Sequence, residues 1–153
     1  MEETQVSADE KVTKELMKTL EDGRLGYEQA AEQLSSEQGS ISLKLSAEAN
    51  RRFEMYTELQ NLALSYGDEL EESGSVAAAV HRGWLAVKDS LASNSIAAVL
   101  GAALTGENYS IEQYEEALAG DLSDGFRPVV QRQLEVLRTA LSELENWAAA
   151  VKN

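Results

Sequence analysis

Carboxylates are the side chains of this sequence best suited to chemistry, because the chain carries 27 acidic residues, one histidine and no cysteine. The lack of cysteine excludes a thiol nucleophile and any cysteine-ligated zinc or iron–sulfur site. The single histidine, His81, excludes a site within one chain that needs two imidazoles. An all-oxygen site for a hard cation therefore stays open, with iron or manganese as the metals it would take.

The charge balance limits the partners. Thirteen basic residues against 27 acidic ones give a formal net charge of −14, which argues against nucleic acid and against an anionic membrane surface. The acidic start, Met1-Glu2-Glu3, lacks the basic end and the apolar stretch of a secretory signal, and no window of the sequence resembles a membrane span. We therefore expect a cytoplasmic protein.

Apolar residues recur with a period close to 3.6 in four long stretches, which predicts four amphipathic helices. Three cover about residues 9–34, 40–66 and 95–119, and the fourth follows an N-cap at Asp124 and ends near Val151. Such helices bury their apolar faces only against one another, so the fold class is all-α, a four-helix bundle. We expect one domain over residues 1–153, with residues 1–8 flexible.

The connection between the second and third helices is much longer than the other two. Almost thirty residues separate them, enough for a crossover that spans the bundle and carries a short extra helix over about 75–91. A bundle whose helices alternate in direction would need only a tight turn there. The lengths therefore predict the connectivity of a ferritin-like fold.

Several segments carry more than helical periodicity. They are Asp22-Gly-Arg-Leu-Gly-Tyr-Glu-Gln-Ala-Ala31, His81-Arg-Gly-Trp-Leu-Ala-Val-Lys88 and Gly106-Glu-Asn108. From about Val12 to Leu144 the chain resembles a small bacterial ferritin-like family of unknown function. That family shares the patterns D-G-x-x-G-[YF]-x-x-A-A, H-R-G-W-x-x-x-K and G-E-[DN]. The resemblance implies a ferritin-like bundle and no settled activity.

A ferritin-like di-iron centre needs an inward carboxylate from each of two helices and a Glu-x-x-His from each of the other two. On helical wheels, Glu107 lies in the middle of the buried stripe of its helix, at the position of the G-E motif. The first helix instead turns Leu20, Gly23 and Tyr27 inward, and the fourth turns Gln133 inward. The Glu-x-x-His spacing occurs nowhere, so the sequence predicts a degenerate di-iron site.

The second helix turns Glu48 and Arg52 inward, four residues apart. An unpaired buried charge is costly, and the permanent, forked charge of arginine suits a buried carboxylate. We therefore predict a core polar cluster of Glu107, Glu48, Arg52 and Gln133, in which Arg52 neutralises Glu107, Glu48 or both. In the alternative, Glu48 and Arg52 lie at the edge of the stripe or under a loop, and Glu107 forms a hydrogen bond with water or a tyrosine.

The most specific of the family-like segments is the H-R-G-W element of the crossover, which consists of His81, Arg82, Gly83 and Trp84. His81 lies to the side of its helix's apolar stripe, and the sequence places no serine, cysteine or acid beside it, so we expect a packing or hydrogen-bonding role. We expect Trp84 to anchor the crossover to the bundle. Gly23 and Gly26 each cost a helix about 1 kcal/mol relative to alanine and so indicate close approach by another segment.

Three functional interpretations follow. The first is a protein without enzymatic activity or cofactor that acts by association, as a homodimer or with a protein partner, or as a stress-related accessory protein. The second is a weak iron- or manganese-binding or oxidising protein that uses the carboxylates of Glu107 and Glu48. The third is a bundle that holds an apolar small ligand. Metal analysis separates the second from the first.

Overall fold

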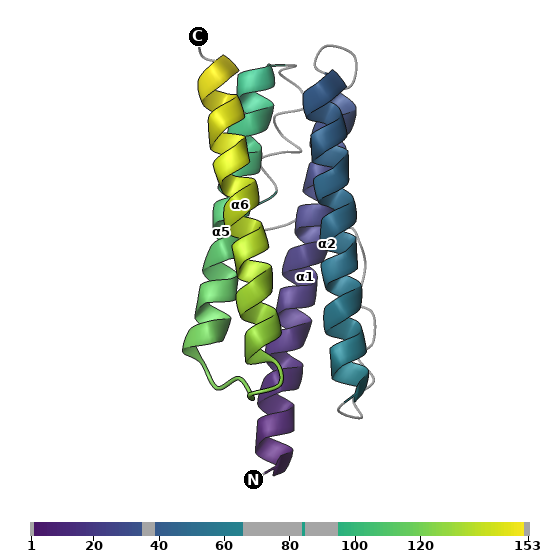
Figure 1. Cartoon of the computed structure of the whole chain (residues 1–153), viewed down its shortest axis with the longest axis vertical. Coiled ribbons are helices and arrows are strands. Elements are labelled where there is room, and N and C mark those ends of the chain that lie inside the picture. The colour runs from purple at the N-terminus through teal and green to yellow at the C-terminus, as the bar shows by residue number, and fades with distance from the viewer. Residues whose placement is uncertain (1, 35–38, 66–83, 85–94, 152–153) are drawn as a thin grey trace.

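The computed structural model describes residues 2–34, 39–65, 84 and 95–151. Four long helices make up almost all of this part of the chain: α1 (Glu2–Leu34), α2 (Gly39–Ser65), α5 (Ile96–Ala119) and α6 (Arg127–Val151). They pack side by side as a bundle (Figure 1). The predicted all-α class and the four-helix bundle are confirmed. Within the described residues, no helix has both the length and the apolar character that crossing a membrane requires.

The four helices differ in direction along the bundle. α1 and α6 run one way, and α2 and α5 run the other way (Figure 1). The pairs α1–α2 and α5–α6 are therefore antiparallel, whereas α2 and α5 are parallel. The connection from the end of α2 to the start of α5 has to cover the length of the bundle, as the predicted crossover requires. The predicted short helix over 75–91 lies outside the described residues, apart from Trp84.

Local hydrogen bonds set where α5 and α6 begin. Ser95 caps α5, because its side-chain oxygen accepts a hydrogen bond from the backbone N–H of Ala98 at 3.2 Å. The N-cap predicted for the fourth helix, Asp124, is wrong, because α6 begins at Arg127 and Asp124 lies in the turn before it. The backbone N–H of Arg127 bonds the carbonyl oxygen of Ser123 at 3.0 Å, and Phe126 is buried. Core packing of Phe126 therefore shapes this turn.

α1 begins at Glu2, several residues before the predicted start near Asp9. Asp9 is buried, and its Oδ1 accepts a hydrogen bond from the backbone N–H of Ser123 at 3.0 Å. Asp9 therefore ties the interior of α1 to the connection between α5 and α6, a tertiary contact that local sequence does not indicate. Residues 2–8 are helical, and their predicted flexibility stays a prediction.

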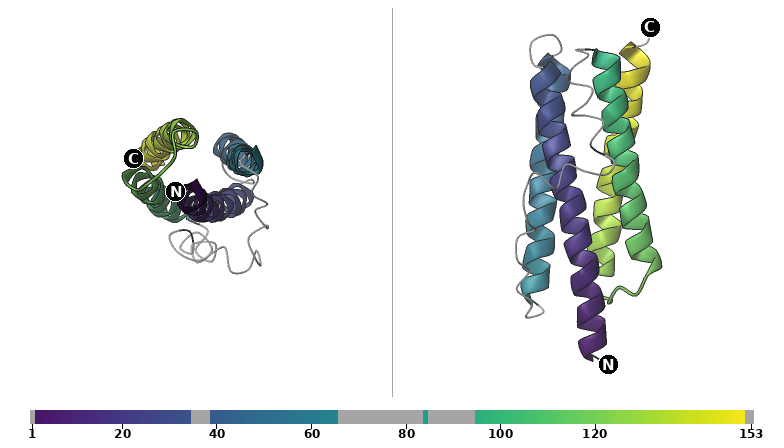
Figure 2. Two further views of the ribbon diagram at one scale, coloured as in Figure 1. Left: turned by 90° about the horizontal axis from the view of Figure 1, so that it is seen from below. Right: turned by 180° about the vertical axis from the view of Figure 1, so that it is seen from behind.

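Two clusters of apolar side chains form the core, and a polar layer lies where they meet. α1 contacts both α2 and α5, and α5 also contacts α6 (Figure 2). Along α2, Arg52 lies between Ala49 of one cluster and Met55 of the other. Along α5, Glu107 likewise lies between residues of the two clusters. Large members of the first cluster are Leu16, Leu20, Leu59 and Leu137, and those of the second are Leu34, Leu45, Leu100 and Leu144.

The ring of Trp84 fills a notch between α1 and α5, where it is fully buried. The notch exists because Gly26 and Gly106 have no side chains. A β-carbon on Gly26 would lie 2.2 Å from Cε3 of the ring, and one on Gly106 would lie 2.3 Å from Cδ2. Trp84 Nε1 donates a hydrogen bond to Ser110 Oγ at 3.0 Å. The tryptophan is therefore held by close packing against Gly26 of α1 and Gly106 of α5 and by one polar contact.

We predict that Gly26→Ala and Gly106→Ala each lower the free energy of unfolding by about 1–3 kcal/mol, because the added methyl group overlaps a ring with no room to move. Urea unfolding followed by circular dichroism measures this. Gly101→Ala is the matched control in α5, because a β-carbon there meets nothing within 4 Å. It should stabilise the protein by up to about 1 kcal/mol through helix propensity. Equal effects at all three glycines would contradict the notch.

Candidate functional site

Glu107 is a fully buried carboxylate at mid-length in the bundle, on α5. Its Oε1 accepts a hydrogen bond from Arg52 Nη2 at 2.7 Å, and its Oε2 accepts one from the Tyr27 hydroxyl at 2.7 Å. Leaving such a group uncompensated would cost several kcal/mol. Here α1 and α2 each supply one donor, so both oxygens of the carboxylate are satisfied by neighbouring helices.

Arg52 joins two carboxylates through one guanidinium group. Its side chain is 1% exposed, and Nη1 lies 3.4 Å from Glu48 Oε2 while Nη2 holds Glu107. The guanidinium carbon also lies 5.3 Å from the centre of the Tyr27 ring, a cation–π distance. Glu48 is 12% exposed and pairs at the surface with Arg51 at 2.9 Å. The cluster therefore runs from the core to the solvent along α2.

Burial sets the ionisation behaviour of this cluster. It raises the pKa of the Glu107 carboxyl, and Arg52 and the Tyr27 hydroxyl act in the opposite direction. Burial also disfavours the charged form of Arg52, but Glu107, Tyr27, Glu48 and Tyr114 together outweigh this and raise the pKa of the guanidinium. Burial, together with the charge of Glu107, raises the pKa of Tyr27 well above its usual value. Arg52 is therefore cationic and Tyr27 is a neutral hydrogen-bond donor.

Gln133, which the sequence assigned to the same cluster, lies in a second polar group beside it. Its Oε1 accepts a hydrogen bond from the Tyr114 hydroxyl at 2.7 Å. Its Nε2 donates to the backbone oxygen of Met55 at 3.2 Å and to Glu58 Oε1 at 2.9 Å. The sulfur of Met55 lies 3.7 Å from Arg52 Nη1, so this residue adjoins both groups. Gln133 therefore joins α6 to α2 and α5.

The structure thus brings Arg52 to both Glu107 and Glu48. The tyrosine of the alternative interpretation is present as well, since Tyr27 shares Glu107 with Arg52. Within the crossover motif, Trp84 lies against α1 and α5, whereas His81, Arg82 and Gly83 lie outside the described residues. Glu107 therefore accepts hydrogen bonds from Tyr27 on α1 and Arg52 on α2.

Sequence reasoning missed three contributors to this region. Gly106 forms the second wall of the Trp84 notch, and Ser110 accepts the indole hydrogen bond. Glu58 bonds Gln133 and also pairs with Arg132. The four-residue spacing of Gly106 and Ser110, which places them on one face of α5, was the available signal for the first two.

The described residues contain no group of three or more histidine, cysteine, aspartate or glutamate side chains arranged to hold a metal ion. Glu107 and Glu48, the candidate ligands, both face Arg52. The polar layer in this part of the chain is a set of hydrogen bonds and ion pairs among protein groups.

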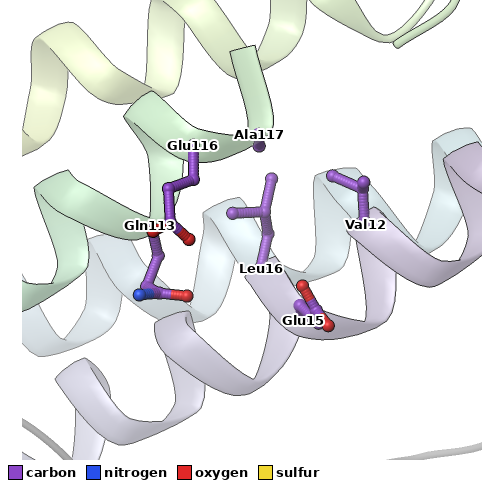
Figure 3. Close-up of a pocket in the computed structure, with 6 residues that line it drawn as sticks. All are labelled: Val12, Glu15, Leu16, Gln113, Glu116 and Ala117. Atoms are coloured by element: carbon purple, nitrogen blue, oxygen red, sulfur yellow. The ribbon is translucent and has the colours of Figure 1, made fainter. Parts of the chain in front are cut away.

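A pocket of about 170 Å³ lies between α1 and α5, toward the C-terminal end of α5. Figure 3 shows its lining residues: Val12, Glu15, Leu16, Gln113, Glu116 and Ala117. Glu15 and Glu116 are exposed, so the pocket has an acidic rim facing solvent. The third functional interpretation places its apolar ligand inside the bundle, and this surface pocket leaves it a prediction.

The fold and the buried layer define a four-helix-bundle protein with an ion pair at the centre of its core. The chain belongs to the family described as a domain of unknown function (DUF2383), whose model matches residues 10–120. The matched range includes Tyr27, Arg52, Trp84 and Glu107, and ends before α6. Neither the curated proteins nor the solved structures gave a match to this chain. The family assignment therefore brings no known activity.

We predict that Arg52→Met lowers the free energy of unfolding by about 3–5 kcal/mol, because it leaves the Glu107 carboxylate buried without its cation. Adding Glu107→Gln should recover part of the loss, with a coupling energy above about 1 kcal/mol in a double-mutant cycle measured by urea unfolding. Arg138→Met, which removes an exposed arginine paired with Glu135, is the control and should leave stability nearly unchanged. Similar losses for Arg52 and Arg138 would refute this reading.

The raised pKa of Tyr27 predicts a loss of stability at alkaline pH. Its pKa in the folded protein is raised well above the ordinary value of 10.0. Above about pH 10 the unfolded chain releases this proton and the folded chain keeps it, so the free energy of unfolding falls as pH rises. Tyr27→Phe should therefore show a shallower fall over this range in urea unfolding. Tyr109→Phe, at a partly exposed position on α5, is the matched control and should keep the wild-type slope.

Proposed function

We propose that this chain is a ferritin-like bundle protein whose di-iron layer is degenerate, and that it acts by association rather than by catalysis. The observation that carries the proposal is the position of Arg52, whose guanidinium group lies 2.7 Å from Glu107 and 3.4 Å from Glu48. In this layer the positive charge belongs to the side chain of Arg52, where a di-iron protein would hold metal ions.

The arrangement of the helices supports the ferritin-like part of the proposal. α2 and α5 are parallel and follow one another across a long connection, which is the connectivity of ferritin-like bundles (Figure 1). In such proteins the metal layer is built from carboxylates and histidines that point inward at mid-length. Here the corresponding layer holds the fully buried carboxylate of Glu107 together with Tyr27 and Arg52.

Electrostatics supports the proposal that the di-iron layer is degenerate. A divalent ion at Glu107 would have to approach a guanidinium group that is 1% exposed and stays protonated at any physiological pH. Both oxygens of Glu107 are already engaged, by Arg52 and by Tyr27. Metal binding would therefore require Arg52 and Tyr27 to release the two oxygens of Glu107.

The alternative function is weak binding or oxidation of iron or manganese by Glu107 and Glu48. One observation favours it: the two carboxylates converge on the same guanidinium group, so displacement of Arg52 would leave two oxygen ligands facing one position. Two carboxylates and water suit a hard cation.

Metal analysis of purified protein tests the proposal. After growth in iron- and manganese-supplemented medium, we expect substoichiometric metal in the wild type, and no Fe²⁺ binding in anaerobic titration. Glu107→Gln should behave like the wild type. Glu143→Gln, which removes an exposed acid of α6, is the control for net charge. Stoichiometric iron or manganese that is lost in Glu107→Gln and kept in Glu143→Gln would overturn the proposal and support the alternative.

A further inference from the structure

The outer face of α2 carries three exposed large apolar side chains. Leu43 is 75% exposed, Phe53 is 55% exposed and Leu64 is 49% exposed. They lie outside the buried stripe of the same helix, which includes Leu45 and Leu59. α2 also lies at one edge of the arrangement of helices, next to α1 (Figure 2). Among the described helices, none covers this face.

These three residues belong to a regular seam. Steps of three and four residues connect Leu43, Ser46, Asn50, Phe53, Thr57, Gln60 and Leu64, and we call these seven residues the α2 seam. Alternating steps of three and four are the repeat that keeps one stripe of a helix facing a partner helix. The seam extends over about 32 Å at 1.5 Å per residue.

Charge distinguishes the α2 seam from the other exposed faces. None of its seven residues is charged, although the chain has a net charge of −14. The exposed faces of the other described helices carry charged side chains, among them Lys11, Lys14, Lys18 and Glu28 on α1, Glu112, Glu115 and Glu116 on α5, and Arg132, Glu135, Arg138 and Glu143 on α6. Two acidic copies of this chain would meet with least repulsion along the seam.

The order of residues in the seam matches a two-fold axis. Leu43 and Leu64 lie ten and eleven residues from Phe53, one on each side. In an antiparallel pair of α2 helices with the axis near Phe53, Leu43 of one copy faces Leu64 of the other, and the two Phe53 side chains meet. Asn50 then faces Thr57, which pairs two polar side chains. Closed two-fold dimers use the same patch on both subunits in this way.

We infer that the α2 seam is the interface of a homodimer in which the α2 helices of two copies pack antiparallel. This inference names the partner in the association that the proposed function invokes, and it depends on that proposal only for its biological role. An interface one helix wide is at the small end of specific interfaces, so the dimer should be weak and dependent on concentration.

Sedimentation equilibrium over a wide range of protein concentration tests the dimer. The average mass of the wild type should rise with concentration toward twice the mass of one chain. Phe53→Asp, which places a charge at the centre of the seam, should stay at the mass of one chain. Asn146→Asp adds the same charge at an exposed position on α6 and should dimerise as the wild type does. Circular dichroism establishes that both variants keep their helical content.

Single-cysteine variants test the orientation, because the chain has no cysteine of its own. Under mild oxidation, a mixture of Leu43→Cys and Leu64→Cys proteins should form the mixed disulfide several-fold faster than Leu43→Cys protein forms a disulfide with itself. Faster self-pairing of Leu43→Cys would overturn the antiparallel arrangement. A wild type that stays at the mass of one chain at every concentration, or a Phe53→Asp variant that dimerises unchanged, would overturn the interface.

The outcomes of these tests separate from those of the metal test. Stoichiometric iron in the wild type would overturn the proposed function and leave the mass measurements unaffected. A monomeric wild type without metal would overturn the homodimer through the α2 seam. It would leave unaffected the proposal that Arg52 takes the place of metal in the layer.

Discussion

The ion pair between Arg52 and Glu107 is the constraint on which the rest of the bundle depends. Two opposite charges lie at the centre of the core, 2.7 Å apart, and neither has access to solvent that could replace its partner. Apolar side chains alone tolerate a small slide of one helix along another, but a buried charge separated from its partner costs several kcal/mol. The pair therefore fixes the axial position of α2 against α5, and the Tyr27 hydroxyl does the same for α1.

Trp84 extends this layer to the crossover. Its ring lies 5.1 Å from the ring of Tyr27, which donates to Glu107. Gly26 and Gly106 leave the space for the indole, and Ser110 accepts its N–H. One continuous set of contacts thus links the connection between α2 and α5 to the charged centre. Both oxygens of Glu107 accept hydrogen bonds from protein groups, which supports the proposal that this layer has a structural role.

If the core is closed in this way, the surface is where a function by association would reside. Most exposed faces of the described helices carry charged side chains, which oppose the close approach of two copies with a net charge of −14. The α2 seam differs, because Leu43, Phe53 and Leu64 are exposed and the other four seam residues are uncharged, whereas the exposed charges of Lys44, Arg51 and Glu54 lie beside the seam. The inner face of α2 therefore holds Arg52, and the outer face carries the α2 seam, the interface of the proposed homodimer.

The sequence by itself determined the helices, the bundle and the inward direction of Glu107, Arg52 and Glu48, because a period of 3.6 residues specifies the angle of each side chain around its own helix. It left open which acid Arg52 meets, and it did not indicate that Gln133 bonds Tyr114, Met55 and Glu58. Only the tertiary structure decided that Arg52 bridges both acids, that Tyr27 shares Glu107, and that Gly106 faces Trp84. The physical reason is that a wheel carries no information on how far one helix is shifted along another, and that shift is set by packing between helices.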